Sequence, residues 1–147
     1  SDGAGDVSGR VDAGESMGHK AVIETHTPLV FLHFTLQPGA SFTQPVGPEY
    51  NAFAYVVNGR AQFGGEAQAA GEGQAVLFGG DGESVTLGVP ADASEPASVL
   101  LLAGVPLNEP VARYGPFVMN TQREIMEAIE DYRAGRMGII PAEVARA

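Results

Sequence analysis

The middle of the chain alternates short runs of β-branched and aromatic residues with clusters of glycine, proline and aspartate. Runs of this kind, bounded by turn residues, are typical of β-strands. The predicted strands cover residues 20–26, 29–36, 52–59, 75–78, 84–89 and 98–103. Many short strands at regular intervals predict an all-β sandwich or barrel.

Two stretches predict how these runs are joined. Asn58-Gly59 is a strong hairpin signal, so we expect residues 52–59 to turn directly into a strand at residues 60–63. The glycine- and alanine-rich stretch 64–73 predicts a long loop. Because side chains alternate across a strand, we also expect Ala52, Ala54 and Val56 to face inward and the residues between them to face outward.

The last third of the chain changes to a helical pattern, and we expect an α-helix over about residues 122–134. Thr121 and Glu124 have the spacing of a capping box, and Gly135 suits the left-handed conformation that ends many helices. Apolar residues recur at helical spacing and form one stripe, made of Ile125, Ile129 and Tyr132 with Met126 beside them. A helix of this length is not stable alone, so the stripe must pack on the β domain or on another chain.

Composition divides the chain further. Residues 1–18 are rich in glycine, serine and aspartate and lack a signal-peptide pattern, which predicts a flexible N-terminal linker. We expect the β domain over residues 19–112 and a C-terminal segment over residues 113–147. A chain of 147 residues is long enough for one domain with a sizeable core.

The charge balance limits the partners of the protein. Acidic residues outnumber basic ones by 18 to 8, for a formal charge of −10. Nucleic acids and anionic membranes repel such a surface, and no apolar run approaches the length of about 20 residues that a membrane span needs. We therefore expect no direct nucleic-acid or membrane partner. The absence of cysteine suits a reducing cytoplasm, which is the expected location.

One stretch has the spacing of a metal site without its ligands. The stretch runs Gly39, five residues, Pro45, one residue, Gly47, four residues, Ala52, six residues, Gly59. In the cupin superfamily this spacing frames two histidines and a glutamate, and a fourth ligand follows where Ser84 lies here. Metals of this class take imidazole and carboxylate ligands, which Pro45, Gly47, Ala52 and Ser84 do not supply. We expect no catalytic, cofactor-binding or metal-binding residue in this chain.

Other residues with catalytic or metal-binding chemistry have simpler interpretations. The histidines are His19, His26 and His33, the loop acids are Glu72, Asp81 and Glu83, and the candidate proton donor is Tyr55. The histidines are interpreted as surface or core residues, the acids as solvated loop charges, and the tyrosine as a sheet-packing residue. An enzyme with an atypical site remains an alternative.

The C-terminal third resembles the end of the pirin family. The matching residues are Gly104, Pro106, Leu107, Glu109 and Pro110, then 115–121, then Asp131, Tyr132 and Gly135. The similarity extends over about residues 17–138, and His33 stands where many members have an acidic residue. The resemblance implies a double-stranded β-helix, or cupin, barrel with a C-terminal α-helix.

The resemblance also implies a division of labour. Pirins are bicupins whose N-terminal half holds iron with three histidines and one glutamate, while the C-terminal barrel has no ligands. This chain is similar to that second half. Its expected role is structural or regulatory support for the iron-bearing N-terminal cupin, its expected partner. The family is associated with quercetin 2,3-dioxygenase activity and with redox-sensing regulation, and we expect this chain alone to be inactive. The alternative is a stand-alone module that binds a small apolar ligand in the emptied barrel.

A surface for partners is expected in the C-terminal segment. The stretch from Tyr114 to Met119 is unusually apolar for a link into a helix, and large exposed apolar patches mark interfaces. The predicted interface or barrel-closing residues are Phe117, Met119, Ile125, Ile129 and Tyr132. We expect a homodimer when the N-terminal cupin is absent.

Overall fold

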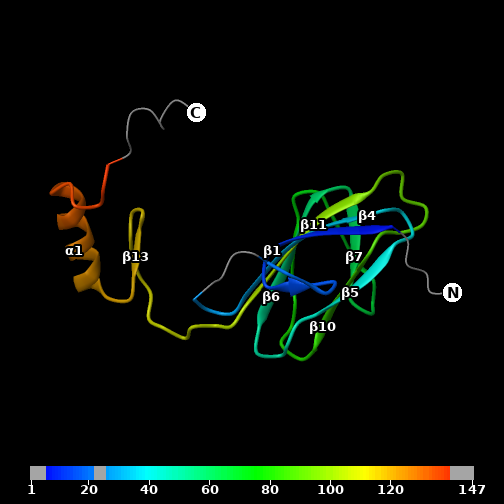
Figure 1. Cartoon of the computed structure of the whole chain (residues 1–147), viewed down its shortest axis with the longest axis horizontal. Coiled ribbons are helices and arrows are strands. Elements are labelled where there is room, and N and C mark those ends of the chain that lie inside the picture. The colour runs from blue at the N-terminus through cyan, green and yellow to red at the C-terminus, as the bar shows by residue number, and fades with distance from the viewer. Residues whose placement is uncertain (1–5, 22–25, 140–147) are drawn as a thin grey trace. The chain divides into compact units, whose positions relative to one another are not determined.

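The computed structural model describes residues 6–21 and 26–139, which fall into two compact units. The first, here called the sheet unit, is Ser1–Pro106, and the second, the tail unit, is Leu107–Ala147 (Figure 1). The boundary lies between Pro106 and Leu107, whereas the sequence placed it between residues 112 and 113.

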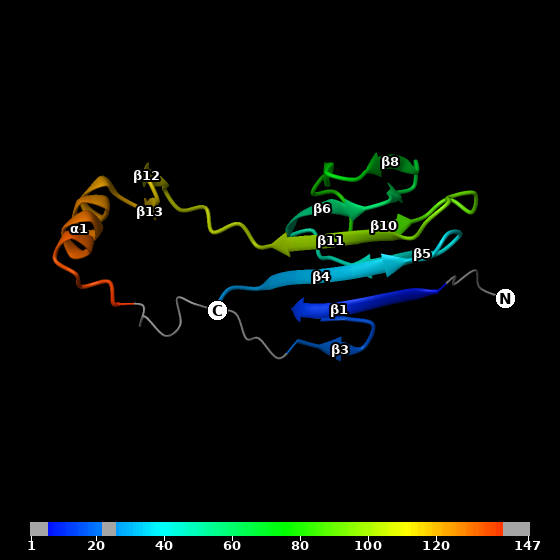
Figure 2. The same cartoon turned by 90° about the horizontal axis from the view of Figure 1, so that it is seen from above.

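The sheet unit consists of two antiparallel sheets and a short hairpin. The first sheet has the order β1 (Val7–Ala13), β4 (Leu29–Leu36), β11 (Ala97–Gly104), β6 (Asn51–Asn58) and β9 (Ala75–Leu77). The second sheet has the order β5 (Ser41–Pro45), β10 (Ser84–Gly88), β7 (Arg60–Phe63) and β8 (Gln68–Gly71). The hairpin pairs β2 (Glu15–Ser16) with β3 (His19–Lys20). Figure 2 shows β1, β4 and β11 side by side.

Both sheets contribute to one hydrophobic core. Phe34 of β4 and Leu101 of β11 are almost fully buried, as are Leu87 of β10 and Phe63 of β7 in the other sheet. Alternation along β11 is strict, because every second residue from Ala97 onward is buried. The unit is therefore mostly β with one core between two sheets, and closure of these sheets into a barrel stays a prediction.

The predicted hairpin at Asn58-Gly59 is wrong. β6 pairs with β11 and β9, whereas β7 pairs with β10 and β8, so the chain passes from one sheet to the other at Gly59. Gly59 has a φ of 77°, and a Cβ atom there would lie 2.5 Å from the carbonyl oxygen of Pro96. The left-handed turn that the sequence signalled is present, but the close approach to Pro96 directs the next strand into the other sheet.

Two segments expected to be irregular contain strands. Residues 64–73 include β8, which pairs with β7 from Phe63 opposite Gln68 to Arg60 opposite Gly71. In the N-terminal segment, expected to be a linker over residues 1–18, β1 pairs with β4 along its length. Tertiary pairing overrides weak local propensity in both cases. The predicted strand at residues 20–26 falls partly outside the described residues, and residues 1–5 lie wholly outside them.

The tail unit contains a hairpin of β12 (Ala112–Tyr114) and β13 (Phe117–Met119), followed by α1 (Gln122–Arg133). The capping box is confirmed: Thr121 Oγ1 accepts from the backbone N–H of Glu124 at 3.3 Å, and Glu124 Oε2 accepts from the backbone N–H of Thr121 at 2.8 Å. Gly135 has the expected left-handed conformation, with φ of 70°. Over residues 6–21 and 26–139, no helix has the length and apolar character that a membrane crossing requires.

Candidate functional site

The four positions predicted to lack ligands lie in or next to three strands of the sheet unit, β5, β6 and β10. Pro45 ends β5 and lies directly opposite Ser84, the first residue of β10, and both residues are exposed. Gly47 follows β5 in a turn, and Ala52 lies on β6. Gly47, Ala52 and Ser84 line one recess, whereas Pro45 is absent from its lining. The structure therefore brings three of the four positions together.

The recess has a volume of about 30 Å³, which is room for about one water molecule. The remaining lining residues are Val46, Tyr50, Phe78, Gly79, Gly82 and Val85. None of the lining side chains is an imidazole or a carboxylate, the ligands that a cupin iron requires. The residues present therefore do not fit an iron site. The recess is also too small for the apolar ligand of the alternative hypothesis.

The expected alternation along β6 is confirmed. Ala54 and Val56 are fully buried, while Phe53, Tyr55 and Val57 are each about 40% exposed. The small inward residues leave little free space at the candidate site, because Val46 and Phe78 line the recess from outside β6.

Gln44 faces the interior in place of Pro45. Gln44 is 4% exposed, as is Ser16. The side-chain oxygen Oε1 of Gln44 accepts a hydrogen bond of 2.6 Å from the hydroxyl of Ser16. The side-chain amide Nε2 donates to the backbone oxygens of Glu15 at 3.2 Å and Pro45 at 3.0 Å. Sequence reasoning missed this residue, although its position between two apolar residues with the same parity, Phe42 and Val46, was a usable signal.

The histidines do not assemble with other candidate ligands. His33 Nε2 lies 2.7 Å from the hydroxyl of Ser98 on β11, and His19 and His26 are exposed. The acids Glu72, Asp81 and Glu83 are also exposed. Within residues 6–21 and 26–139, no group of three or more histidine, aspartate or glutamate side chains is placed to hold a metal ion.

The tail unit contains an apolar groove with a volume of about 640 Å³. Four of the five predicted interface residues line it, namely Phe117, Ile125, Ile129 and Tyr132, together with Tyr114 and Met126. Met119 does not line the groove. Ile125 is 1% exposed, and the rings of Phe117 and Tyr132 meet edge to face with centroids 6.3 Å apart.

The floor of this groove is packed while its rim is open. Met126 is 58% exposed and Tyr132 is 67% exposed. The side chain of Asn120 ties the start of α1 to the segment before β12, by donating to Glu109 Oε2 at 2.8 Å and to the backbone oxygen of Pro110 at 3.1 Å. Hydrogen bonds thus fix the segments around the groove, while apolar side chains on its rim stay exposed. Exposed apolar patches of this kind are typical of interfaces.

Comparison with known proteins places the sheet unit and the tail unit in one family. Residues 31–138 match the Pirin C-terminal cupin domain. The chain is 45% identical over 132 residues to a Pirin-like protein of Solanum lycopersicum, covering 90% of this chain and 45% of the relative. It is 38% identical over 135 residues to Pirin of Homo sapiens, with 90% and 45% covered.

A solved structure gives the same result. The crystal structure of quercetin 2,3-dioxygenase from Acinetobacter baumannii superposes with a TM-score of 0.79 and 34% sequence identity, over 88% of this chain and 43% of that chain. This chain therefore spans less than half the length of the relatives it matches. The family match, the identities and the superposition agree, and the chain belongs to the pirin family, as a Pirin C-terminal cupin domain.

Proposed function

We propose that this chain is the non-metal-binding cupin of a longer pirin-like protein and that it supports an iron-bearing N-terminal cupin. The observation that carries the proposal is the recess of about 30 Å³ lined by Gly47, Ala52 and Ser84. A cupin metal needs imidazole or carboxylate ligands, and the recess offers none. The strands and turns around the recess are those of a cupin, but the lining side chains cannot act as the ligands of a cupin metal.

The chemistry of the parent protein then belongs to the other cupin. The relatives are about twice as long as this chain, and one superposed structure is named quercetin 2,3-dioxygenase. The parent would accordingly act as a quercetin 2,3-dioxygenase-like enzyme or as a redox-sensing regulator. The chain alone would not turn over a flavonol, because the iron centre would be supplied by the partner half.

The groove of the tail unit provides a means of support. Its exposed rim, which includes Met126 and Tyr132, places apolar side chains in water unless another surface covers them. The additional length of the relatives would supply such a surface in the parent protein. We propose the N-terminal cupin as the partner that packs on this groove.

Metal content tests the first part of the proposal. The purified chain is incubated with Fe(II) without oxygen, dialysed and analysed for metals, and we expect no stoichiometric iron. A chimera in which this chain replaces the matching segment of the Solanum lycopersicum relative serves as the positive arm. We expect about one iron per chain in the chimera, held by ligands outside this sequence.

Substitution in the groove tests the support role within the same chimera. Met126→Asp places a charge on the exposed rim and should lower iron retention during dialysis, whereas Val118→Asp, an equally exposed site outside the groove, should not. Tightly bound iron in the chain alone would overturn the non-metal role. Equal iron retention by both variants would overturn the support role while leaving the first result intact.

A further inference from the structure

A second pocket lies in the sheet unit, away from the recess at the vacant metal positions. It has a volume of about 280 Å³ and is lined by residues of β1, of the β2–β3 hairpin and of β4, none of which lines the recess. Its volume is close to the lower limit of pockets that bind small organic molecules, about 300 Å³. We call it the hairpin pocket.

The lining of the hairpin pocket separates into an apolar and a cationic part. Val11 and Met17 provide accessible apolar surface above a floor formed by Leu32 and Phe34, which are at most 1% exposed. Arg10, His19 and Lys20 provide basic groups. No carboxylate is among the lining residues. A pocket with this lining favours a ligand that has an apolar body and a negative charge.

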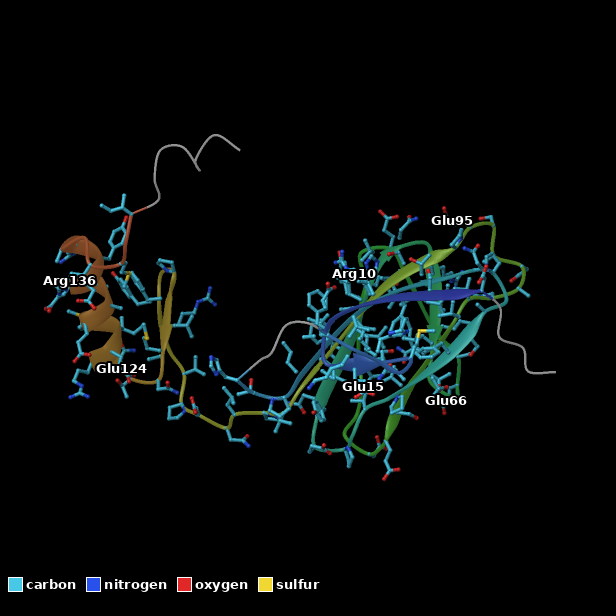
Figure 3. All side chains as sticks on the ribbon, viewed as in Figure 1. Arg10, Glu15, Glu66, Glu95, Glu124 and Arg136 are labelled. Atoms are coloured by element: carbon cyan, nitrogen blue, oxygen red, sulfur yellow. The ribbon has the colours of Figure 1, made fainter. Side chains whose placement is uncertain are left out.

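The basic residues stand out because the sheet unit is strongly acidic. Its lysines and arginines are Arg10, Lys20 and Arg60, and two of these three line the hairpin pocket. Asp12 pairs with Arg10 at 3.0 Å, and Glu15 lies opposite Lys20 in the hairpin register, but neither carboxylate lines the pocket. Figure 3 shows Arg10 and Glu15 on opposite sides of β1 in that view. The lysine and the imidazole are thus the groups best placed to receive an anion.

The backbone keeps this pocket open. A Cβ atom on Gly9 would lie 3.2 Å from the Phe34 ring and 3.5 Å from the sulfur of Met17, so a larger residue would intrude on the apolar part. Met17 has a φ of 51°, in the left-handed region that residues with a side chain rarely adopt. Met17 and Gly18 are the two central residues of the β2–β3 turn, where a tight hairpin requires positive φ, so the turn fixes the Met17 side chain beside the pocket. The polarizable thioether of Met17 also suits contact with an aromatic ring.

From this arrangement we propose that the hairpin pocket binds a small amphipathic anion, specifically an aromatic monocarboxylate. The ring packs against Val11 and the Met17 thioether, above the floor that Leu32 and Phe34 form. The carboxylate accepts hydrogen bonds from the Lys20 ammonium and a ring N–H of His19. This inference is independent of the partner half and of the recess.

The four methionines provide the readout. Met17 lines the hairpin pocket and Met126 lines the groove of the tail unit, so methionine-methyl NMR distinguishes specific binding from general apolar association. The chain is titrated with phenylacetate and, in a second arm, with the neutral phenylacetamide. We expect saturable shifts of the Met17 methyl with phenylacetate, little change at Met126, and affinity for the amide weaker by about tenfold.

Two variants and one control complete the test. Lys20→Ala should weaken phenylacetate binding by about tenfold, and Gly9→Val should abolish it by filling the apolar part. Arg60→Ala removes the same charge from the sheet unit away from the pocket and should leave the affinity unchanged. Equal affinity for acid and amide, equal loss with Arg60→Ala and Lys20→Ala, or shifts that appear first at Met126 would overturn the proposal. So would the absence of a Met17 shift up to about 10 mM phenylacetate, which excludes millimolar affinity.

Discussion

Gln44 is a polar side chain among apolar neighbours, and its hydrogen bonds explain why the interior tolerates it. Both ends of the amide are used: Oε1 accepts from Ser16, and Nε2 donates to the backbone oxygens of Glu15 and Pro45. These bonds join the β2–β3 hairpin to β5 in the second sheet. A single residue thereby positions one wall of the hairpin pocket.

The hydrogen bond between Ser16 and Gln44 should contribute to the stability of the fold. Ser16→Ala leaves Gln44 Oε1 buried without this donor, so the free energy of unfolding should fall by about 1–3 kcal/mol. In a Gln44→Met background the same serine substitution should cost much less, because no buried acceptor is then left unpaired. Urea unfolding followed by circular dichroism measures all four members of this cycle. Equal costs of Ser16→Ala in both backgrounds would show that the bond carries no coupling.

At the scale of elements, α1 illustrates a local sequence signal that the structure reproduces. The capping box of Thr121 and Glu124, one turn of chain apart, satisfies backbone N–H groups that the helix cannot satisfy itself. At the other end, Asp131 in the last turn forms an ion pair with Arg136, which follows the helix. Figure 3 labels Glu124 and Arg136 at the two ends of the helix.

The stability of the first turn of α1 should depend on pH. Hydrogen bonds from the Thr121 side chain and backbone lower the pKa of Glu124 below its ordinary value of 4.5. Because the pKa is lowered in the folded state, the ionised carboxylate stabilises the helix start above about pH 4.5, and this stabilisation is lost as pH falls through the lowered pKa. The amide proton signal of Thr121 should titrate with Glu124.

A matched variant separates this effect from general acid unfolding. Glu124→Gln keeps an acceptor at the same place without an ionisable group, so the Thr121 amide signal should lose its titration below pH 4.5. If the Thr121 amide still titrates in the variant, another carboxylate is responsible and the prediction is wrong.

The elements differ in how far sequence alone could predict them. β4 and β11 were predictable because their long apolar runs carry enough signal of their own. β8 and β1 were not, since glycine, alanine, serine and aspartate form strands there only by pairing with β7 and β4. The turn at Gly59 was predictable as a left-handed conformation, but the sheet that receives β7 depends on the contact with Pro96. Local pattern therefore specified conformations, while pairing partners required tertiary contacts.

The candidate site shows the same limit. The missing ligands at Gly47 and Ala52 could be read from spacing alone, and both residues line the recess. The outward position of Pro45 and the inward position of Gln44 could not, because strand parity in β5 depends on which residues meet the core. The hairpin pocket was also missed, since it is built partly by residues expected to form a linker.

At the scale of the whole molecule, the chain is two units that cover less than half of its relatives. The sheet unit has its own two-sheet core. The tail unit has a small core around Ile125 and Ala128 and a groove whose rim is exposed. The isolated chain lacks the rest of a longer protein that could cover that rim, and a second copy presents an apolar surface of the same kind.

We predict that the isolated chain forms a homodimer through this groove. Covering the exposed parts of Met126 and Tyr132 in both copies removes apolar surface from water, at about 25 cal/mol per Å². A twofold arrangement would use the same surface in each copy. Sedimentation equilibrium should therefore show a dimer that dissociates on dilution, and the partner cupin would compete for the same face.

Met126→Asp should raise the dimer dissociation constant at least about tenfold, because each copy would place a carboxylate in the apolar interface. Ile129→Asp should act in the same direction and also lower the melting temperature, since Ile129 is half-buried in the tail unit. Val118→Asp is the control, because Val118 is 57% exposed and does not line the groove. A chain that sediments as a monomer at all concentrations would refute the dimer. A dimer that Val118→Asp disrupts and Met126→Asp does not would place the interface on the opposite face of the β12–β13 hairpin.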